Sequence, residues 1–157
     1  MQERKRLSDW DPQVAAPLTK KFEGLRLSAY KCPAGVWTIG YGSTRMLSGI
    51  PVAQGDRITQ DEADKLLLKT LREARDGAAR YCSALLTAGQ AAAIIDFTFN
   101  VGDGKFARST LCAKLRGMPG TEVECAYEFL KWKYAGGREL PGLVLRREAE
   151  KASFLKR

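Results

Sequence analysis

Residues 21–42 of the 157-residue chain read KFEGLRLSAYKCPAGVWTIGYG, and this stretch joins two kinds of local structure. Residues 18–23 are typical of a short helix, which we expect to end at Gly24 because glycine commonly follows the last residue of a helix. From about residue 27 to residue 58 glycines multiply, with β-branched and aromatic residues between them. The stretch therefore predicts a lead helix followed by a small β-meander or hairpin.

The sequence after residue 58 is predicted to be helical, because residues that cap helices precede apolar segments. Thr59 and Glu62 form a capping-box pattern before a stretch with one apolar stripe, which predicts a long helix over 61–82. Thr87 and Gln90 repeat the pattern before a wholly apolar segment. The further helices that we expect cover residues 91–101 (ended by Gly102), 110–116 (after Ser109), 122–134 (after Thr121) and 143–155.

These elements describe an α+β protein, and the length favours a single domain over residues 1–157. We expect the domain to consist of an N-terminal arm (1–16), a lead helix and β lobe (17–58), a connecting helix (59–82) and a helical lobe (83–157). The arm is predicted to be loose up to about Pro17, because Pro12 and Pro17 interrupt a charged segment. The candidate cleft lies between the sheet and the helices.

The composition excludes several kinds of chemistry. The chain contains no histidine, which rules out Ser-His-Asp catalysis, Cys-His catalysis and imidazole zinc sites. Its four cysteines have no C-x-x-C spacing, so we expect no metal and no cofactor, and we expect Cys82, Cys112 and Cys125 to be free thiols in the core. The 26 Lys and Arg exceed the 18 Asp and Glu, and this charge of +8 favours an anionic partner such as a cell-wall polymer. No nucleic-acid-binding motif accompanies it.

Glu23 is the candidate catalytic acid. It follows Phe22 at the end of the lead helix and lies just before the glycine-rich segment. A carboxyl group held against apolar walls has a raised proton affinity, because burial penalises its charged form, and such a group can protonate a glycosidic oxygen. Position alone also allows a solvated glutamate at a helix end.

Residues 21–42 resemble the active-site signature of the phage-type lysozymes, the bacteriophage endolysins that cut peptidoglycan. That signature has a glutamate, usually an aspartate nine residues later, and a threonine six residues further within T-I-G-x-G; here Glu23, Cys32 and Thr38 occupy these positions. The resemblance extends over roughly residues 17–157. Its further matches are residues 97–102, 109–111, 129–132, 136–143 and 146–148.

The resemblance implies a role for each matched residue. Glu23 would be the general acid, and Thr38 would orient the attacking water or contact the reacting sugar, although it could also be a plain strand residue. Thr44, Phe99 and Asn100 would contact the saccharide, with Phe99 equally possible as a core residue.

Cys32 departs from the family pattern, because the usual residue is a carboxylate. Three interpretations are open: Cys32 replaces the carboxylate as a thiolate or water-holding group, it is a bystander, or it forms a disulfide that masks the site. We expect the Glu23 anion to raise the pKa of the thiol and Lys31 to oppose that effect.

The family also implies the function: a muramidase that hydrolyses the β-1,4 bond between N-acetylmuramic acid and N-acetylglucosamine and so lyses the host cell. The alternatives are a lytic transglycosylase and a non-catalytic peptidoglycan-binding module.

The delivery of such an enzyme can be predicted as well. The N-terminal residues MQERKRLSDWDPQ contain no apolar signal region, and no run of about eighteen apolar residues follows. For a chain without such a signal, the family resemblance implies accumulation in the host cytoplasm and release to the wall through a holin pore. We also expect a monomer with no stable protein partner.

Overall fold

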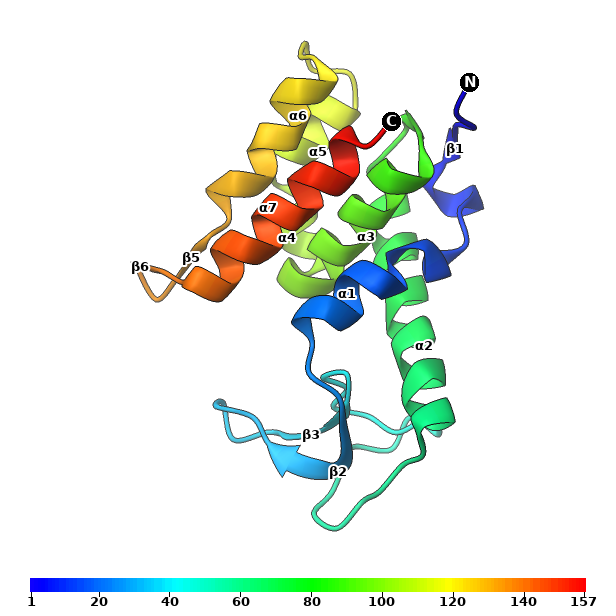
Figure 1. Ribbon diagram of the computed structural model, residues 1–157, viewed down its shortest axis with the longest axis vertical. Helices are drawn as coiled ribbons and strands as arrows, with labels where there is room; N and C mark the ends of the chain where they lie inside the picture. Colours follow the sequence, from blue (N-terminus) through cyan, green and yellow to red (C-terminus); the bar gives the residue numbers. More distant parts are fainter.

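One long helix, α2 (Gln60–Ala79), connects the two parts of the molecule (Figure 1). At one end of α2 lies a hairpin of β2 (Arg26–Lys31) and β3 (Trp37–Gly40), and at the other end lie most of the helices together with both termini. The structure is a computed structural model that describes residues 1–157. None of its helices combines the length and apolar character that a membrane crossing requires.

The remaining elements are short apart from two helices. The other α-helices are α1 (Ala16–Phe22), α3 (Ala88–Val101), α4 (Asp103–Ala107), α5 (Thr110–Leu115), α6 (Glu122–Glu128) and α7 (Pro141–Leu155). Single turns of 3₁₀-helix are η1 (Leu7–Asp9), η2 (Pro12–Ala15) and η3 (Phe129–Lys131). The other strands form two antiparallel pairs, β1 (Lys5–Arg6) with β4 (Leu85–Leu86) and β5 (Tyr134–Ala135) with β6 (Arg138–Glu139). The molecule thus combines helices with three small antiparallel strand pairs, which confirms the α+β prediction.

The helix starts agree with the predicted caps. The Thr87 hydroxyl accepts from the Gln90 N–H and the Gln90 side chain accepts from the Thr87 N–H, which completes the capping box of α3. This helix ends, as predicted, at Gly102, whose φ is 92°. At α2 only half of the predicted box forms, because Thr59 Oγ1 accepts from the Glu62 N–H at 3.1 Å without a reciprocal bond.

Several helix boundaries differ from the predictions. α6 ends at Glu128 and continues only as η3, whereas the sequence predicted a helix to residue 134. The cause is the two-residue turn of Gly136 and Gly137, with φ of 58° and 75°, which pairs β5 with β6 and so takes Tyr134 into a strand. α2 ends three residues earlier than predicted. α7 begins two residues earlier than predicted, at Pro141, because proline fits the first position of a helix.

The prediction of a loose N-terminal arm over residues 1–16 is wrong. Leu7 is fully buried, and the Trp10 indole N–H donates to the Leu86 carbonyl at 2.9 Å. β1 pairs with β4, which ties the arm to the segment before α3. Two apolar side chains therefore outweigh the polar composition of the segment and make it part of the helical lobe.

α3 lies at the centre of the helical lobe and packs against α2 and α7. Residues 91–98 of this helix are all buried. The Phe97 ring meets the rings of Phe129 and Trp132 edge-on, at centroid distances of 5.4 and 5.5 Å. The core of the molecule therefore surrounds the predicted apolar helix.

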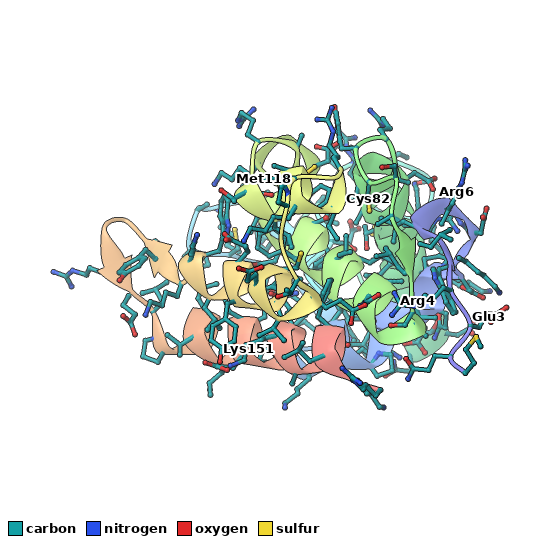
Figure 2. The ribbon with its side chains drawn as sticks, turned by 90° about the horizontal axis from the view of Figure 1, so that it is seen from above. Glu3, Arg4, Arg6, Cys82, Met118 and Lys151 are labelled. Atoms are coloured by element: carbon teal, nitrogen blue, oxygen red, sulfur yellow. The ribbon has the colours of Figure 1, made fainter.

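The three cysteines of the helical lobe are buried free thiols, which confirms the prediction for Cys82, Cys112 and Cys125. Cys82, labelled in Figure 2, lies inside the helical lobe, whereas the labelled Arg6 points outward. Burial raises the pKa of the Cys82 thiol to about 11. These cysteines therefore act as small apolar core residues.

Candidate active site

A cleft of about 490 Å³ opens between the hairpin lobe and the helical lobe. The end of α1, the chain after β3, the middle of α2 and the C-terminal turn of α3 all contribute residues to its walls. Of the residues singled out in the sequence, Glu23, Phe99 and Asn100 line this cleft. Their convergence places one carboxyl group beside one aromatic ring and one amide.

Glu23 comes directly after the last residue of α1, where the backbone turns from helical to extended. Its side chain is 25% exposed, and its Oε1 accepts a hydrogen bond from Arg146 Nη1 at 2.7 Å. The other oxygen, Oε2, lies over Gly42, where a Cβ atom would come within 3.5 Å of it. Glu23 is therefore held in the cleft and is not a freely solvated helix-end residue. Sequence reasoning described glycine-rich and partly apolar surroundings for Glu23 and did not foresee the contact with an arginine.

Arg146 connects Glu23 to the buried interior. Its Nε and Nη2 atoms donate to Asp96 Oδ2 and Oδ1 at 3.0 and 2.8 Å, and Thr19 Oγ1 donates to Asp96 Oδ1 at 2.7 Å. Asp96 is fully buried, which by itself disfavours its charged form, yet the hydrogen bonds from Arg146 outweigh burial and hold the pKa of Asp96 below its usual range. Asp96 thereby fixes the guanidinium that holds Glu23.

A second buried arginine connects the interior to Asn100. Arg147 is fully buried, and its Nη2 donates to Asn100 Oδ1. On its other side Nη1 lies 3.1 Å from Glu150 Oε2, and the guanidinium lies 4.9 Å from the centre of the Phe97 ring. Burial raises the pKa of Glu150 well above its usual range. Because Arg147 donates to the Asn100 carbonyl, the NH₂ group of this exposed residue can still donate to a ligand.

Sequence reasoning did not assign roles to Asp96, Arg146 or Arg147. A signal existed in each case. Charged residues are rare in a core unless they are paired. Asp96 interrupts the apolar run 91–98, and Arg146 and Arg147 lie on a helix that packs against α3.

Cys32 and Thr38 lie in the hairpin lobe and are not among the residues that line the cleft. The Cys32 thiol is half-buried and free. A hydrogen bond from the Val36 N–H lowers the pKa of this thiol, and the Ala34 N–H and the Thr38 hydroxyl add to that effect. Thr38 itself is buried, and its Oγ1 donates to the Val36 carbonyl at 3.0 Å.

Two expectations about Cys32 need correction. We expected the Glu23 anion to raise the pKa of the thiol and Lys31 to oppose that effect. The pKa is lowered instead, chiefly by a backbone hydrogen bond from Val36, and the Lys31 ammonium lies over the Trp37 ring, 5.4 Å from its centre. The interpretation as a masking disulfide is not supported, because the other cysteines are buried in the helical lobe. Thr44 is exposed and also lies outside the cleft walls.

A hairpin lobe, a long connecting helix and a helical lobe with a glutamate in the cleft between them define the lysozyme-like class of glycoside hydrolases. The family model described as phage lysozyme matches residues 20–150. The chain therefore belongs to the phage lysozyme family, and it is a glycoside hydrolase of the endolysin type.

Individual relatives agree with this assignment. The endolysin of Acyrthosiphon pisum secondary endosymbiont phage 1 is 42% identical over 141 residues, which cover 87% of this chain and 92% of that protein. The endolysin from Escherichia coli O157:H7 phage FAHEc1 superposes with a TM-score of 0.82 at 30% identity, over 99% of this chain and 96% of that one. The muramidase domain of SpmX from Asticaccaulis excentricus superposes with a TM-score of 0.79 at 32% identity, over 92% of this chain and 97% of that one.

Proposed function

We propose that the chain hydrolyses the β-1,4 bond between N-acetylmuramic acid and N-acetylglucosamine in peptidoglycan, with Glu23 as the general acid. The observation that carries this proposal is the position of Glu23, one oxygen bound to Arg146 and the other directed over Gly42 in the cleft. The name of the muramidase domain among the structural neighbours supports the choice of bond.

In this mechanism Glu23 Oε2 gives its proton to the bridging oxygen as the glycosidic bond breaks, and the leaving sugar departs as an alcohol. The remaining sugar develops positive charge at its anomeric carbon. Water adds there and gives up one proton, which restores the carboxyl group of Glu23. Arg146 keeps the other carboxyl oxygen in place, and Asp96 keeps Arg146 in place, so that the acid needs no reorientation during the reaction.

Cys32 and Thr38 would assist from the hairpin lobe. Because its pKa is lowered, the Cys32 thiol gains thiolate character, and a thiolate can hold water or stabilise positive charge as the usual carboxylate does. The Thr38 hydroxyl adds to the lowering of the Cys32 pKa and would support that group. The alternative in which Cys32 is a bystander stays open, since it does not line the cleft.

Phe99 and Asn100 are the saccharide contacts that the geometry supports best. Phe99 is half-buried in the cleft wall, and the Arg146 guanidinium lies 5.9 Å from the centre of its ring. A sugar face can pack on the ring while the Asn100 NH₂ group donates to a hydroxyl or acetamido oxygen. Thr44, exposed on the hairpin lobe, would contact a more distant part of the glycan.

One observation favours a second reaction, that of a lytic transglycosylase. This reaction needs one acid and closes the muramic acid onto itself, and position 32 holds a thiol where a second carboxylate is usual. Product analysis separates the two reactions, because hydrolysis leaves reducing ends and transglycosylation leaves anhydro-muramyl ends.

Clearing of permeabilised Gram-negative cells tests the role of Glu23. We expect Glu23→Gln, which keeps an oxygen for Arg146 but cannot donate the proton, to lower the rate by at least ~100-fold. Glu62→Gln, a change of the same charge outside the cleft, should clear cells like the unmodified protein. Equal clearing by Glu23→Gln would rule out the acid and favour a peptidoglycan-binding module.

Delivery follows as part of the proposal: accumulation as a monomer in the host cytoplasm and release to the wall through a holin. Finding full-length protein outside the cytoplasm of cells that lack a holin would contradict this route.

A further inference from the structure

The charge of the cleft is opposite to that of the molecule. The chain carries a net charge of +8, yet the cleft walls contain the carboxylates Glu23, Glu73 and Asp103 and no lysine or arginine. Arg146 holds Glu23, but neither of the other two carboxylates forms an ion pair. Two uncompensated negative charges therefore face the cleft from its α2–α4 side.

These two carboxylates lie along one face of α2. Glu73 and Gly77 are four residues apart on α2 and so share one face of the helix. The Asp103 side chain rests on Gly77, where an added Cβ atom would come within 2.9 Å of Asp103 Cβ and 3.0 Å of Oδ2. The position that carries Glu73 and the position on which Asp103 rests are thus about one helical turn apart, roughly 6 Å along α2.

A buried hydroxyl next to them lacks a partner. Thr98 contributes to the same cleft wall and is 2% exposed, and its Oγ1 has no hydrogen-bond partner within the protein. A buried polar atom without a partner is costly, and a ligand that donates a hydrogen bond would remove that cost. The two carboxylates favour a positively charged ligand group, and the unpaired hydroxyl favours a group that donates hydrogen bonds.

We propose that this part of the cleft, defined by Glu73, Thr98 and Asp103, binds a primary ammonium group of the substrate. The proposal rests on the proposed function, because peptidoglycan supplies such a group: its stem peptides contain a diamino acid whose second amine is free wherever the peptide is not cross-linked. A metal ion fits less well, since no group of three potential metal ligands occurs in the molecule. The site would make the enzyme prefer glycan next to uncross-linked stems.

Two soluble disaccharide-peptide oligomers test the proposal, one with the free side-chain amine of the diamino acid and one with that amine acetylated. We expect KM to be about fivefold lower for the free-amine substrate, the gain that two partly exposed ion pairs give, with kcat unchanged. Glu73→Gln and Asp103→Asn should each lose much of this preference. Asp76→Asn removes the same charge from α2 outside the cleft and should retain it.

Two further measurements keep the result independent of cleavage. Calorimetry measures the affinity of the Glu23→Gln variant for both oligomers in the absence of cleavage. The preference for the free amine can therefore be tested even if Glu23 is not the catalytic acid. Gly77→Ala displaces Asp103 without removing a charge and should reduce the preference as well. The proposal is overturned if the unmodified protein binds both oligomers equally, or if Glu73→Gln and Asp76→Asn behave alike.

Discussion

Replacing Asp96 with alanine would leave the charge of Arg146 buried and only partly compensated. Asp96 is fully buried and accepts two hydrogen bonds from Arg146 and one from Thr19, at 3.0, 2.8 and 2.7 Å. Removing one partner of a buried ion pair typically costs 3–5 kcal/mol. Because Arg146 keeps its contact with Glu23, we expect the free energy of unfolding to fall by about 3 kcal/mol, the lower part of that range. Such a loss is a large share of the stability of a small protein.

Urea unfolding at pH 7 measures this loss directly, with the free energy of unfolding obtained by linear extrapolation. Asp64→Ala is the matched control, because Asp64 forms an exposed ion pair with Lys20 at 3.0 Å. Exposed pairs of this kind contribute about 1 kcal/mol or less. If Asp96→Ala lowers the free energy of unfolding no more than Asp64→Ala does, the buried network does not stabilise the fold as argued here.

The same residue predicts a dependence on pH. The pKa of Asp96 is lower in the folded state than its unfolded value of about 3.9, so its contribution is complete above that value and is lost as the pH falls below it. The difference between the unmodified protein and Asp96→Ala should therefore stay constant from pH 7 to about pH 5 and shrink below about pH 4. A difference that grows on acidification would contradict the assignment.

Two further predictions concern the hairpin lobe and α3. Cys32→Asp should preserve cell clearing, and Cys32→Ser should reduce it by roughly 10-fold or more, since the serine hydroxyl lacks the thiolate charge; full activity of Cys32→Ser would make the residue a bystander. Thr87→Ala removes the hydroxyl that caps α3 and should lower the free energy of unfolding by about 1 kcal/mol in urea. An unchanged unfolding midpoint in Thr87→Ala would mean that the cap is dispensable in this core helix.

Local chemistry made much of the fold predictable. The capping box of Thr87 and Gln90 and the stop at Gly102 depend only on neighbours in the sequence, and the structure has both. The glycine-rich segment after Glu23 likewise forms the predicted hairpin. The family resemblance added the lysozyme-like architecture, which local signals alone do not specify.

Contacts between distant segments could not be predicted in the same way. The N-terminal segment pairs with residues 85–86 through β1 and through the Trp10 indole, about 80 residues further along the chain. The Arg146 contacts with Glu23 and Asp96 span 123 and 50 residues. Sequence periodicity gives no information about such pairs, because their geometry exists only after the lobes have packed.

The arginine that holds Glu23 belongs to α7, the final helix of the fold. During synthesis, the residue proposed as the acid leaves the ribosome more than a hundred residues before its partner, so an unfinished chain has no means of fixing that carboxyl group in the cleft. In the proposed mechanism, competence to cut the wall therefore arises only when the last helix docks onto α3, and we expect a truncated product of translation to pose little danger to the cell that makes it.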